Sequence, residues 1–258
     1  MISIVIPAYN NSDKIERILK RLYKNERLEI LIVDDGSNFL ESEKLKRFRD
    51  EYHVKYIVQS NMGPSVARLN GFNQASYDYV LFLDADDMFD FYEFDYSMLN
   101  DDFDYYSFGS RYFKDIDICD NYNVNLRPNV LFRDSGKLIF LFNQFGYKSF
   151  WNSSNTIYKK SSIVNIFQPN NLRWAEDIIF KYKVISNLKG RVEANSNRSL
   201  IEISNGRGYL YNVSDVVNLY RELIKNHSGY ILATAVFMRY FTSCLIKKVK
   251  FLKIKNPR

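Results

Sequence analysis

Three carboxylates directly follow an apolar run in the first half of the sequence. Val80 to Leu83 is continuously apolar, which is typical of a strand buried on both faces, and it ends in Asp84, Asp86 and Asp87. Clustered like charges repel one another, and a desolvated carboxylate is costly without a compensating charge. A hard divalent cation such as Mg²⁺ or Mn²⁺ would neutralise the cluster and could in turn hold phosphate groups. The alternative is a solvated acidic turn after a core strand.

The elements that must position this cluster follow from an alternation of apolar runs and amphipathic stretches. We expect Ser12 to be the N-cap of one helix, and a second helix to begin at Gly63-Pro64-Ser65, where Pro64 suits a first helical position. This alternation predicts an α/β fold with a mainly parallel sheet, flanking helices and right-handed crossovers. Ligands of such sheets bind beyond the carboxyl ends of the strands, where the acidic cluster lies. The expected strands span residues 2–6, 28–33, 54–58 and 79–83.

The alternation of apolar runs and amphipathic stretches becomes less regular after Asp87. No internal repeat or low-complexity linker is present, so we expect one domain over residues 1–212 and a helical extension over residues 213–258. The later expected elements are a helix over residues 91–99, strands over 105–113 and 155–159, and a helix over 174–188.

Composition indicates a well-filled globular core. The 258 residues suffice for one sizeable α/β domain with an appendage, and 46% are apolar and 16% aromatic, which argues against disorder. Cys119 and Cys244 provide neither a disulfide framework nor metal-ligand spacing, so a reducing cytoplasm is the simplest location. The first residues lack a basic segment, so no signal peptide is expected. No membrane-spanning helix is expected either, because every long apolar stretch is interrupted by a charge.

The positive charge is concentrated at the end of the chain. Residues 223–258 hold eight Lys or Arg and no Asp or Glu, so the net charge of +6 becomes −2 for residues 1–222. An apolar stripe backed by basic residues is typical of a helix at a membrane interface, and we expect residues 230–258 to meet an anionic membrane surface. The alternative is that the stripe docks on the protein's own core. No nucleic-acid partner is expected. The stripe consists of Ile231, Met238, Phe241, Leu245, Val249 and Leu252.

Polar groups stand at strand ends or helix starts in five segments, and as a set these segments resemble one enzyme family. In this order and spacing they are similar to the inverting family-2 glycosyltransferases with the GT-A fold, over about residues 1–190. The segments are Pro7-Ala8-Tyr9-Asn10, Val33-Asp34-Asp35-Gly36-Ser37, Gly63-Pro64-Ser65-Val66-Ala67-Arg68, Leu83-Asp84-Ala85-Asp86-Asp87 and Trp174-Ala175-Glu176-Asp177.

The resemblance implies a nucleotide-sugar donor site. Tyr9 would lie against the base, Asp35 would accept the N3–H of a uracil, and Asp34 would hold that loop. Asp86 would bind Mn²⁺ or Mg²⁺ that bridges the diphosphate, with Asp87 as a further metal ligand. The implied donor-binding residues are Pro7, Tyr9, Asp34, Asp35, Arg68, Asp84 and Asp86.

The resemblance also implies a catalytic base and an acceptor side. Asp177 would take the proton from the acceptor hydroxyl, and a single displacement assisted by one base implies inversion. Trp151, Trp174 and Glu176 would face the acceptor, although core packing would equally explain both tryptophans. Many relatives supply a histidine to the metal or phosphate site, whereas His53 and His227 are the only histidines here and neither is well placed. Arg207 or Tyr209 is the alternative phosphate contact.

The function that these expectations favour is metal-dependent transfer of a sugar, UDP-linked in the donor, to a saccharide or lipid-linked acceptor in bacterial surface polysaccharide synthesis. The expected location is cytoplasmic and peripheral, at the inner face of the plasma membrane. One alternative is a sugar-nucleotide nucleotidyltransferase, an enzyme that would require a Gly-rich loop with Lys or Arg after the first strand. The other is a non-catalytic sugar-nucleotide-binding or scaffold protein.

Overall fold

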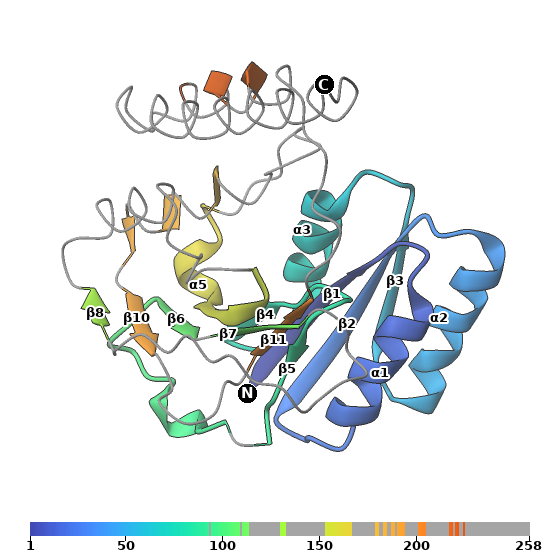
Figure 1. Cartoon of the computed structure of the whole chain (residues 1–258), viewed down its shortest axis with the longest axis horizontal. Coiled ribbons are helices and arrows are strands. Elements are labelled where there is room, and N and C mark those ends of the chain that lie inside the picture. Colours follow the sequence, from blue (N-terminus) through green and yellow to red (C-terminus); the bar gives the residue numbers. More distant parts are fainter. Residues whose placement is uncertain are drawn as a thin grey trace, which may run out of the picture. The chain divides into compact units, whose positions relative to one another are not determined.

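Alternating strands and helices form the first third of the chain (Figure 1). The computed structural model describes residues 1–92, 94–108, 110–113, 130–132, 153–166, 179–180, 183–184, 187–188, 190–193, 201–204, 217–218, 220–221 and 224. The elements of this first part are β1 (Ile2–Ala8), α1 (Ser12–Leu22), β2 (Leu28–Asp35), α2 (Phe39–Glu51), β3 (Lys55–Gln59), α3 (Pro64–Gln74) and β4 (Tyr79–Phe82).

A large mixed sheet of eight strands has the order β3-β2-β1-β4-β9-β6-β10-β8, and a small sheet has the order β5-β11-β7. Strands β1 to β4 pair in parallel, as do β6 and β10, while β9 runs antiparallel to both β4 and β6. The later elements are β5 (Met88–Phe89), η1 (Tyr96–Met98), β6 (Tyr105–Phe108), β7 (Ser110–Phe113), β8 (Val130–Phe132), η2 (Ser153–Asn155), β9 (Thr156–Lys159), α5 (Lys160–Ile163), β10 (Gly190–Glu193) and β11 (Ile201–Ser204).

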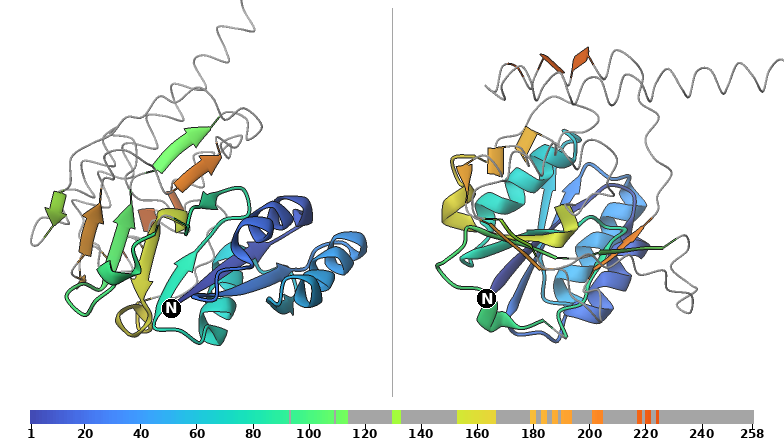
Figure 2. Two further views of the ribbon diagram at one scale, coloured as in Figure 1. Left: turned by 90° about the horizontal axis from the view of Figure 1, so that it is seen from below. Right: turned by 60° about the vertical axis from the view of Figure 1, so that its left-hand side comes forward.

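Helices cover both faces of the parallel half of the large sheet. Helices α1 and α2 lie on one face and α3 on the other (Figure 2), as right-handed crossovers require when β4 returns to the far side of β1. Alternate residues of the strands serve the two faces. Ile4 and Ile6 belong to the core cluster that includes Ile15 of α1, whereas Val5 faces Gly71 of α3. A Cβ at Gly71 would collide with the Val5 side chain, so the close approach of α3 to the sheet requires glycine.

The chain divides into two compact units. The first contains Met1–Arg133, Phe150–Pro169 and Leu188–Gly206, and the second contains Asp134–Ser149, Asn170–Asn187 and Arg207–Arg258. Within the second unit, the structure describes helical residues at 179–180, 183–184, 187, 217–218, 220–221 and 224. In the described part of the chain, no helix is long and apolar enough to cross a membrane. The division at residue 212 and the amphipathic character of residues 230–258 stay predictions.

The predicted α/β fold with its mainly parallel sheet is confirmed, and three local predictions are corrected. Ser12 begins α1, but the N-cap position is Asn11. Of residues 91–99, the described ones, 91–92 and 94–99, form only the short η1, because their aromatic side chains fill the core from irregular backbone. The predicted strand over residues 105–113 is two strands, since Tyr105–Phe108 pairs with β9 and β10 whereas Ser110–Phe113 pairs with β11.

Candidate functional site

The carboxyl ends of β1, β2 and β4 meet at one edge of the large sheet. Ala8 pairs with Asp34 across β1 and β2, and Val5 pairs with Phe82 across β1 and β4. The segments that follow these strands therefore emerge side by side. The last residues of these strands and the segments that follow them carry most of the predicted donor-binding residues, namely Tyr9, Asp34, Asp35, Asp84 and Asp86. The edge is the one at which parallel α/β sheets bind ligands.

Asp34 is fully buried and is committed to holding its own loop. Its Oδ1 accepts a hydrogen bond from the backbone N–H of Ser37 at 2.9 Å, and its Oδ2 accepts one from the hydroxyl of Tyr56 at 2.8 Å. Burial favours the neutral acid, but hydrogen bonds from Ser37, Ser42 and Tyr56 outweigh burial and lower the pKa of Asp34. Burial, together with the adjacent carboxylate, raises the pKa of Tyr56 to about 12. Asp34 is therefore a charged anchor.

Asp35 joins the end of β2 to the entrance of α3. Its Oδ1 accepts hydrogen bonds from Nε2 of Gln59 and the backbone N–H of Met62, both at 2.8 Å. Its Oδ2 accepts one from the backbone N–H of Gly63, the N-cap of α3, at 2.9 Å. A carboxylate offers about four acceptor positions, so one position remains on Oδ2.

Arg68 and Asp84 form a close ion pair beside these loops. Nη2 of Arg68 lies 2.5 Å from Oδ1 of Asp84, and the two side chains are 9% and 31% exposed. The backbone N–H of Asp84 donates to Oγ of Ser154 at 3.0 Å, which connects the acidic segment to η2. Asp84 therefore has a fixed position and a charge partner.

Asp86 and Asp87 differ sharply in exposure. Asp87 is buried, and its backbone N–H donates to the carbonyl of Asp84 in a tight turn. The Asp86 side chain is 38% exposed, and its Oδ2 lies 3.9 Å from Nζ of Lys14 in the first turn of α1. Among the described residues, no group of three or more His, Cys, Asp or Glu could hold a metal ion. Mg²⁺ and Mn²⁺ often use one or two carboxylates and complete their coordination with water and substrate phosphates, which Asp86 fits.

On the base side of the predicted site, Tyr9 is exposed, whereas Asp35 is buried. Tyr9 is 52% exposed, which suits a ring available for stacking, and Pro7 is half-buried in β1. His53 is exposed just before β3, at the amino end of the parallel strands and therefore away from the acidic segment. The other histidine, His227, and the alternative phosphate contacts, Arg207 and Tyr209, lie outside the described residues. Four predicted catalytic or acceptor residues lie outside the described residues: Trp151, Trp174, Glu176 and Asp177.

Several residues that shape this edge were not predicted from the sequence. Lys14 and Tyr56 contact predicted carboxylates, and Ser154 contacts the backbone N–H of Asp84. All three come from elements remote in sequence, so no local pattern pointed to these contacts. Asn38 and Glu41 did carry a signal. An N-cap residue followed three positions later by Glu is the spacing of a capping box at a helix start.

The comparisons with known proteins agree with this geometry. Residues 3–145 match the model of the family described as Glycosyl transferase family 2. Over 91 residues the chain is 37% identical to "Glycosyltransferase GlyA" of Streptococcus pneumoniae serotype 4; the aligned stretch covers 33% of the chain and 13% of that protein. Over 92 residues it is 37% identical to the "Poly-beta-1,6-N-acetyl-D-glucosamine synthase" of Staphylococcus aureus; this stretch covers 34% of the chain and 22% of the synthase.

A solved structure extends the likeness in fold beyond these segments. The crystal structure of S. aureus TarS residues 1–349 in complex with UDP matches with a TM-score of 0.64 and 20% identity, covering 87% of this chain and 64% of that one. The chain thus spans well under two thirds of the curated relatives' length and just under two thirds of the TarS fragment. The family model covers more than half of the chain, and the sheet has the corresponding architecture, so this protein belongs to glycosyl transferase family 2, with the GT-A fold.

Proposed function

We propose that the chain is a metal-dependent inverting glycosyltransferase that moves a sugar from a UDP-linked donor to a saccharide or lipid-linked acceptor. The observation that carries this proposal is the convergence of Tyr9, Asp35, Asp84 and Asp86 at one edge of neighbouring parallel strands. UDP as the nucleotide is supported by the UDP-bound TarS structure. A role in bacterial surface polysaccharide synthesis is supported by the similarity to the staphylococcal polysaccharide synthase.

The helix starts at this edge support a role for a cation. A helix N-terminus can bind a diphosphate through its free N–H groups and its dipole. Here the carboxylate of Glu41 occupies the N–H of Ser12 at the start of α1, and that of Asp35 occupies two N–H groups at the entrance of α3. Both helix starts are therefore partly neutralised by protein carboxylates. The donor diphosphate then needs positive charge from elsewhere, which favours a metal at Asp86 with help from Lys14 or Arg68.

In the proposed donor complex each residue has a separate task. Tyr9 lies against the uracil, Asp35 uses its remaining acceptor position for the N3–H, and Asp34 holds the loop. Arg68 keeps Asp84 in place beside the ribose. Asp86 binds Mn²⁺ or Mg²⁺, which would neutralise the charge on the departing nucleoside diphosphate. Asp87 would be a further metal ligand, and its backbone hydrogen bond to Asp84 would hold the turn around Asp86.

The acceptor half of the proposal concerns residues outside the described ones. Asp177 takes the proton from the acceptor hydroxyl as that oxygen attacks the anomeric carbon, and Trp151, Trp174 and Glu176 face the acceptor. A general base contributes about 10²- to 10⁴-fold. Asp177→Asn should therefore lower the transfer rate by that order and leave UDP affinity unchanged, with a smaller loss in Glu176→Gln. A larger loss in Glu176→Gln would identify Glu176 as the base instead.

The test is nucleotide release from a panel of sugar nucleotides, with Mn²⁺ and with excess EDTA. Free UDP released with an acceptor indicates glycosyl transfer, pyrophosphate indicates a nucleotidyltransferase, and no release indicates a binding or scaffold protein. Asp86→Asn should abolish release and weaken Mn²⁺-dependent UDP binding. The matched control is Asp90→Asn, because within the described part of the chain Asp90 accepts only a local hydrogen bond, from the backbone N–H of Tyr92 after β5. Full activity of Asp86→Asn, or of the wild type in EDTA, would remove the metal from the mechanism.

We also propose that the enzyme works at the inner face of the plasma membrane, with residues 230–258 on the anionic surface. The eight basic residues of the segment 223–258, without a compensating acidic residue, support this location. A membrane-apposed position would suit a lipid-linked acceptor.

A further inference from the structure

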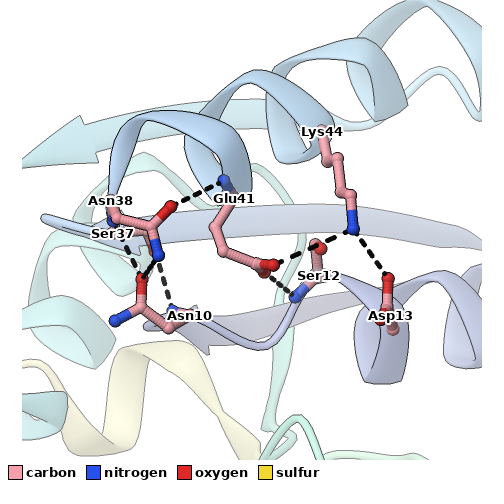
Figure 3. Close-up of polar contacts among 7 residues, drawn as sticks. All are labelled: Asn10, Ser12, Asp13, Ser37, Asn38, Glu41 and Lys44. Carbon is pink, nitrogen blue, oxygen red and sulfur yellow. Dashed lines mark hydrogen bonds and ion pairs between the residues drawn. The ribbon is translucent and has the colours of Figure 1, made fainter.

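The loops after β1 and β2 are tied together by five residues that we call the clasp: Asn10, Ser12, Ser37, Asn38 and Glu41 (Figure 3). The backbone N–H of Asn10 donates to Oγ of Ser37 at 3.0 Å. Oδ1 of Asn10 accepts from the backbone N–H and from Nδ2 of Asn38, at 2.8 and 3.0 Å. The backbone N–H of Ser12 donates to Oε2 of Glu41 at 2.8 Å. Three hydrogen bonds at Asn10, before α1, and one at Ser12, the first residue of α1, thus join the two segments.

The side chain of Asn38 uses both ends of its amide in the clasp. Its Nδ2 donates to Asn10, while its Oδ1 accepts from the backbone N–H of Glu41 at 3.1 Å and so caps α2. A carboxylate has no donor for the first bond and a hydroxyl is too short to serve both partners, so this position is suited to a carboxamide. The cap of α2 and the bridge to β1 therefore form together.

The clasp fixes the backbone of Asn10, the residue that directly follows Tyr9. Asn10 has φ of 52°, a left-handed conformation that asparagine tolerates better than most other residues. Tyr9 directly precedes it and is 52% exposed, so burial does little to fix the ring. On the other side, Ser37 is bonded through its N–H to Asp34, and Asp35 lies two residues before Ser37. The clasp therefore links the stacking residue to the proposed uracil acceptor.

We propose that Asn10, Asn38 and Glu41 are positioning residues that fix the Tyr9 loop relative to the Asp34–Asp35 loop before the donor binds. This inference rests on the proposed function, because the reason to fix these loops is recognition of the nucleotide base. A preorganised site binds more tightly because less conformational entropy is lost on binding. Breaking the clasp should therefore weaken donor binding more than an equally destabilising change elsewhere in the protein.

The first test needs no ligand. Hydrogen exchange of the amides in residues 9–13 and 36–41 is compared between the wild type and Asn10→Gly, which removes the acceptor but keeps the positive φ accessible. Loss of two hydrogen bonds should speed exchange of these amides about tenfold or more, without a change in β1 and β2. Asn10→Asp keeps an acceptor oxygen and should stay close to the wild type. Unchanged exchange in Asn10→Gly would overturn the inference.

A second pair of variants covers the case in which Asn10→Gly does not fold. Glu41→Ala removes the acceptor for the Ser12 N–H, whereas Glu41→Gln keeps an oxygen there. Exchange in residues 11–14 should accelerate in Glu41→Ala and recover in Glu41→Gln. Equal exchange in these two variants would overturn the proposed role of Glu41.

The functional test is UDP affinity with Mn²⁺, measured by calorimetry, together with KM and kcat for the donor. Asn10→Gly should weaken UDP binding about tenfold and raise KM, with a small change in kcat. The matched control is Asn25→Gly, at the opposite edge of the sheet, where Asn25 bonds to Tyr96. A similar drop in melting temperature but no loss of affinity is expected there. Equal UDP affinity in Asn10→Gly and the wild type would mean that the clasp does not contribute to donor binding, and it would overturn the proposed positioning role. Failure of the wild type to bind UDP would instead overturn the proposed donor, and the exchange comparison would still decide the clasp.

Discussion

The ion pair between Arg68 and Asp84 should couple the start of α3 to the acidic segment by about 2 kcal/mol. Exposed pairs contribute about 0.2–1 kcal/mol, whereas breaking a fully buried pair costs about 3–5 kcal/mol. Arg68 is almost fully buried and Asp84 is about one third exposed, with 2.5 Å between Nη2 and Oδ1. The coupling should therefore lie between these limits, because water can reach Asp84 but hardly reaches the guanidinium.

The measurement is a double-mutant cycle. The free energy of unfolding in urea is compared for the wild type, Arg68→Met, Asp84→Asn and the double variant, which isolates the pair from the other contacts of Arg68. The control cycle uses Lys20→Met and Glu16→Gln, an exposed pair on α1 whose coupling should be within the error of the measurement. A coupling below about 0.5 kcal/mol for Arg68 and Asp84 would refute the argument from burial and distance.

Three other predictions concern the sheet and the tail. Burial opposes the charge of Glu29, but hydrogen bonds from Lys55, Ser3 and Ser76 lower its pKa from 4.5 to about 2. Because the folded pKa is depressed, this stabilisation is complete above about pH 4.5 and is lost as the pH falls towards 2. With allowance for solvent screening it amounts to about 1–2 kcal/mol, and urea midpoints of Glu29→Gln should lack this pH dependence. Gly71→Ala should destabilise by about 1–2 kcal/mol in urea, because overpacking against Val5 outweighs the better helix propensity of alanine, and Val5→Ala should restore part of the loss. Truncation near Asn226 should release the protein from anionic liposomes, and a full-length protein that ignores such vesicles at low salt would contradict the membrane prediction.

The sequence predicted the parallel half of the fold well because its strands are continuous apolar runs, as in residues 2–6 and 79–83. It did not predict α2, in which only Leu45 and Phe48 are buried among many charged residues, so the apolar stripe is too narrow to identify. It overestimated the helix at residues 91–99, because burial of aromatic side chains does not require regular backbone.

The candidate site was predictable only in part, for a similar reason. Strand ends could be aligned from the pattern, so Tyr9, Asp35 and Asp84 were expected at one edge. Partners such as Tyr56 and Ser154 come from distant segments and depend on register and side-chain direction. No periodicity encodes those contacts. The roles of Asp86 and Asp87 at the metal could not be separated from their spacing and stay predictions; the structure adds only that Asp87 is buried and that Asp86 is partly exposed.

The position of β4 has a consequence for the growing chain. Its neighbour β1 has already been synthesised when β4 appears, whereas β9, its other neighbour, follows more than 70 residues later. Until β9 is synthesised, one side of β4 is an edge with unpaired backbone N–H and C=O groups. Such an edge promotes association with other chains. The amide of Asp84 gains its partner, Ser154, 70 residues away, only when this late segment docks. Truncated chains that end before β9 should therefore depend on chaperones and should lack an ordered acidic segment even if their first four strands have paired.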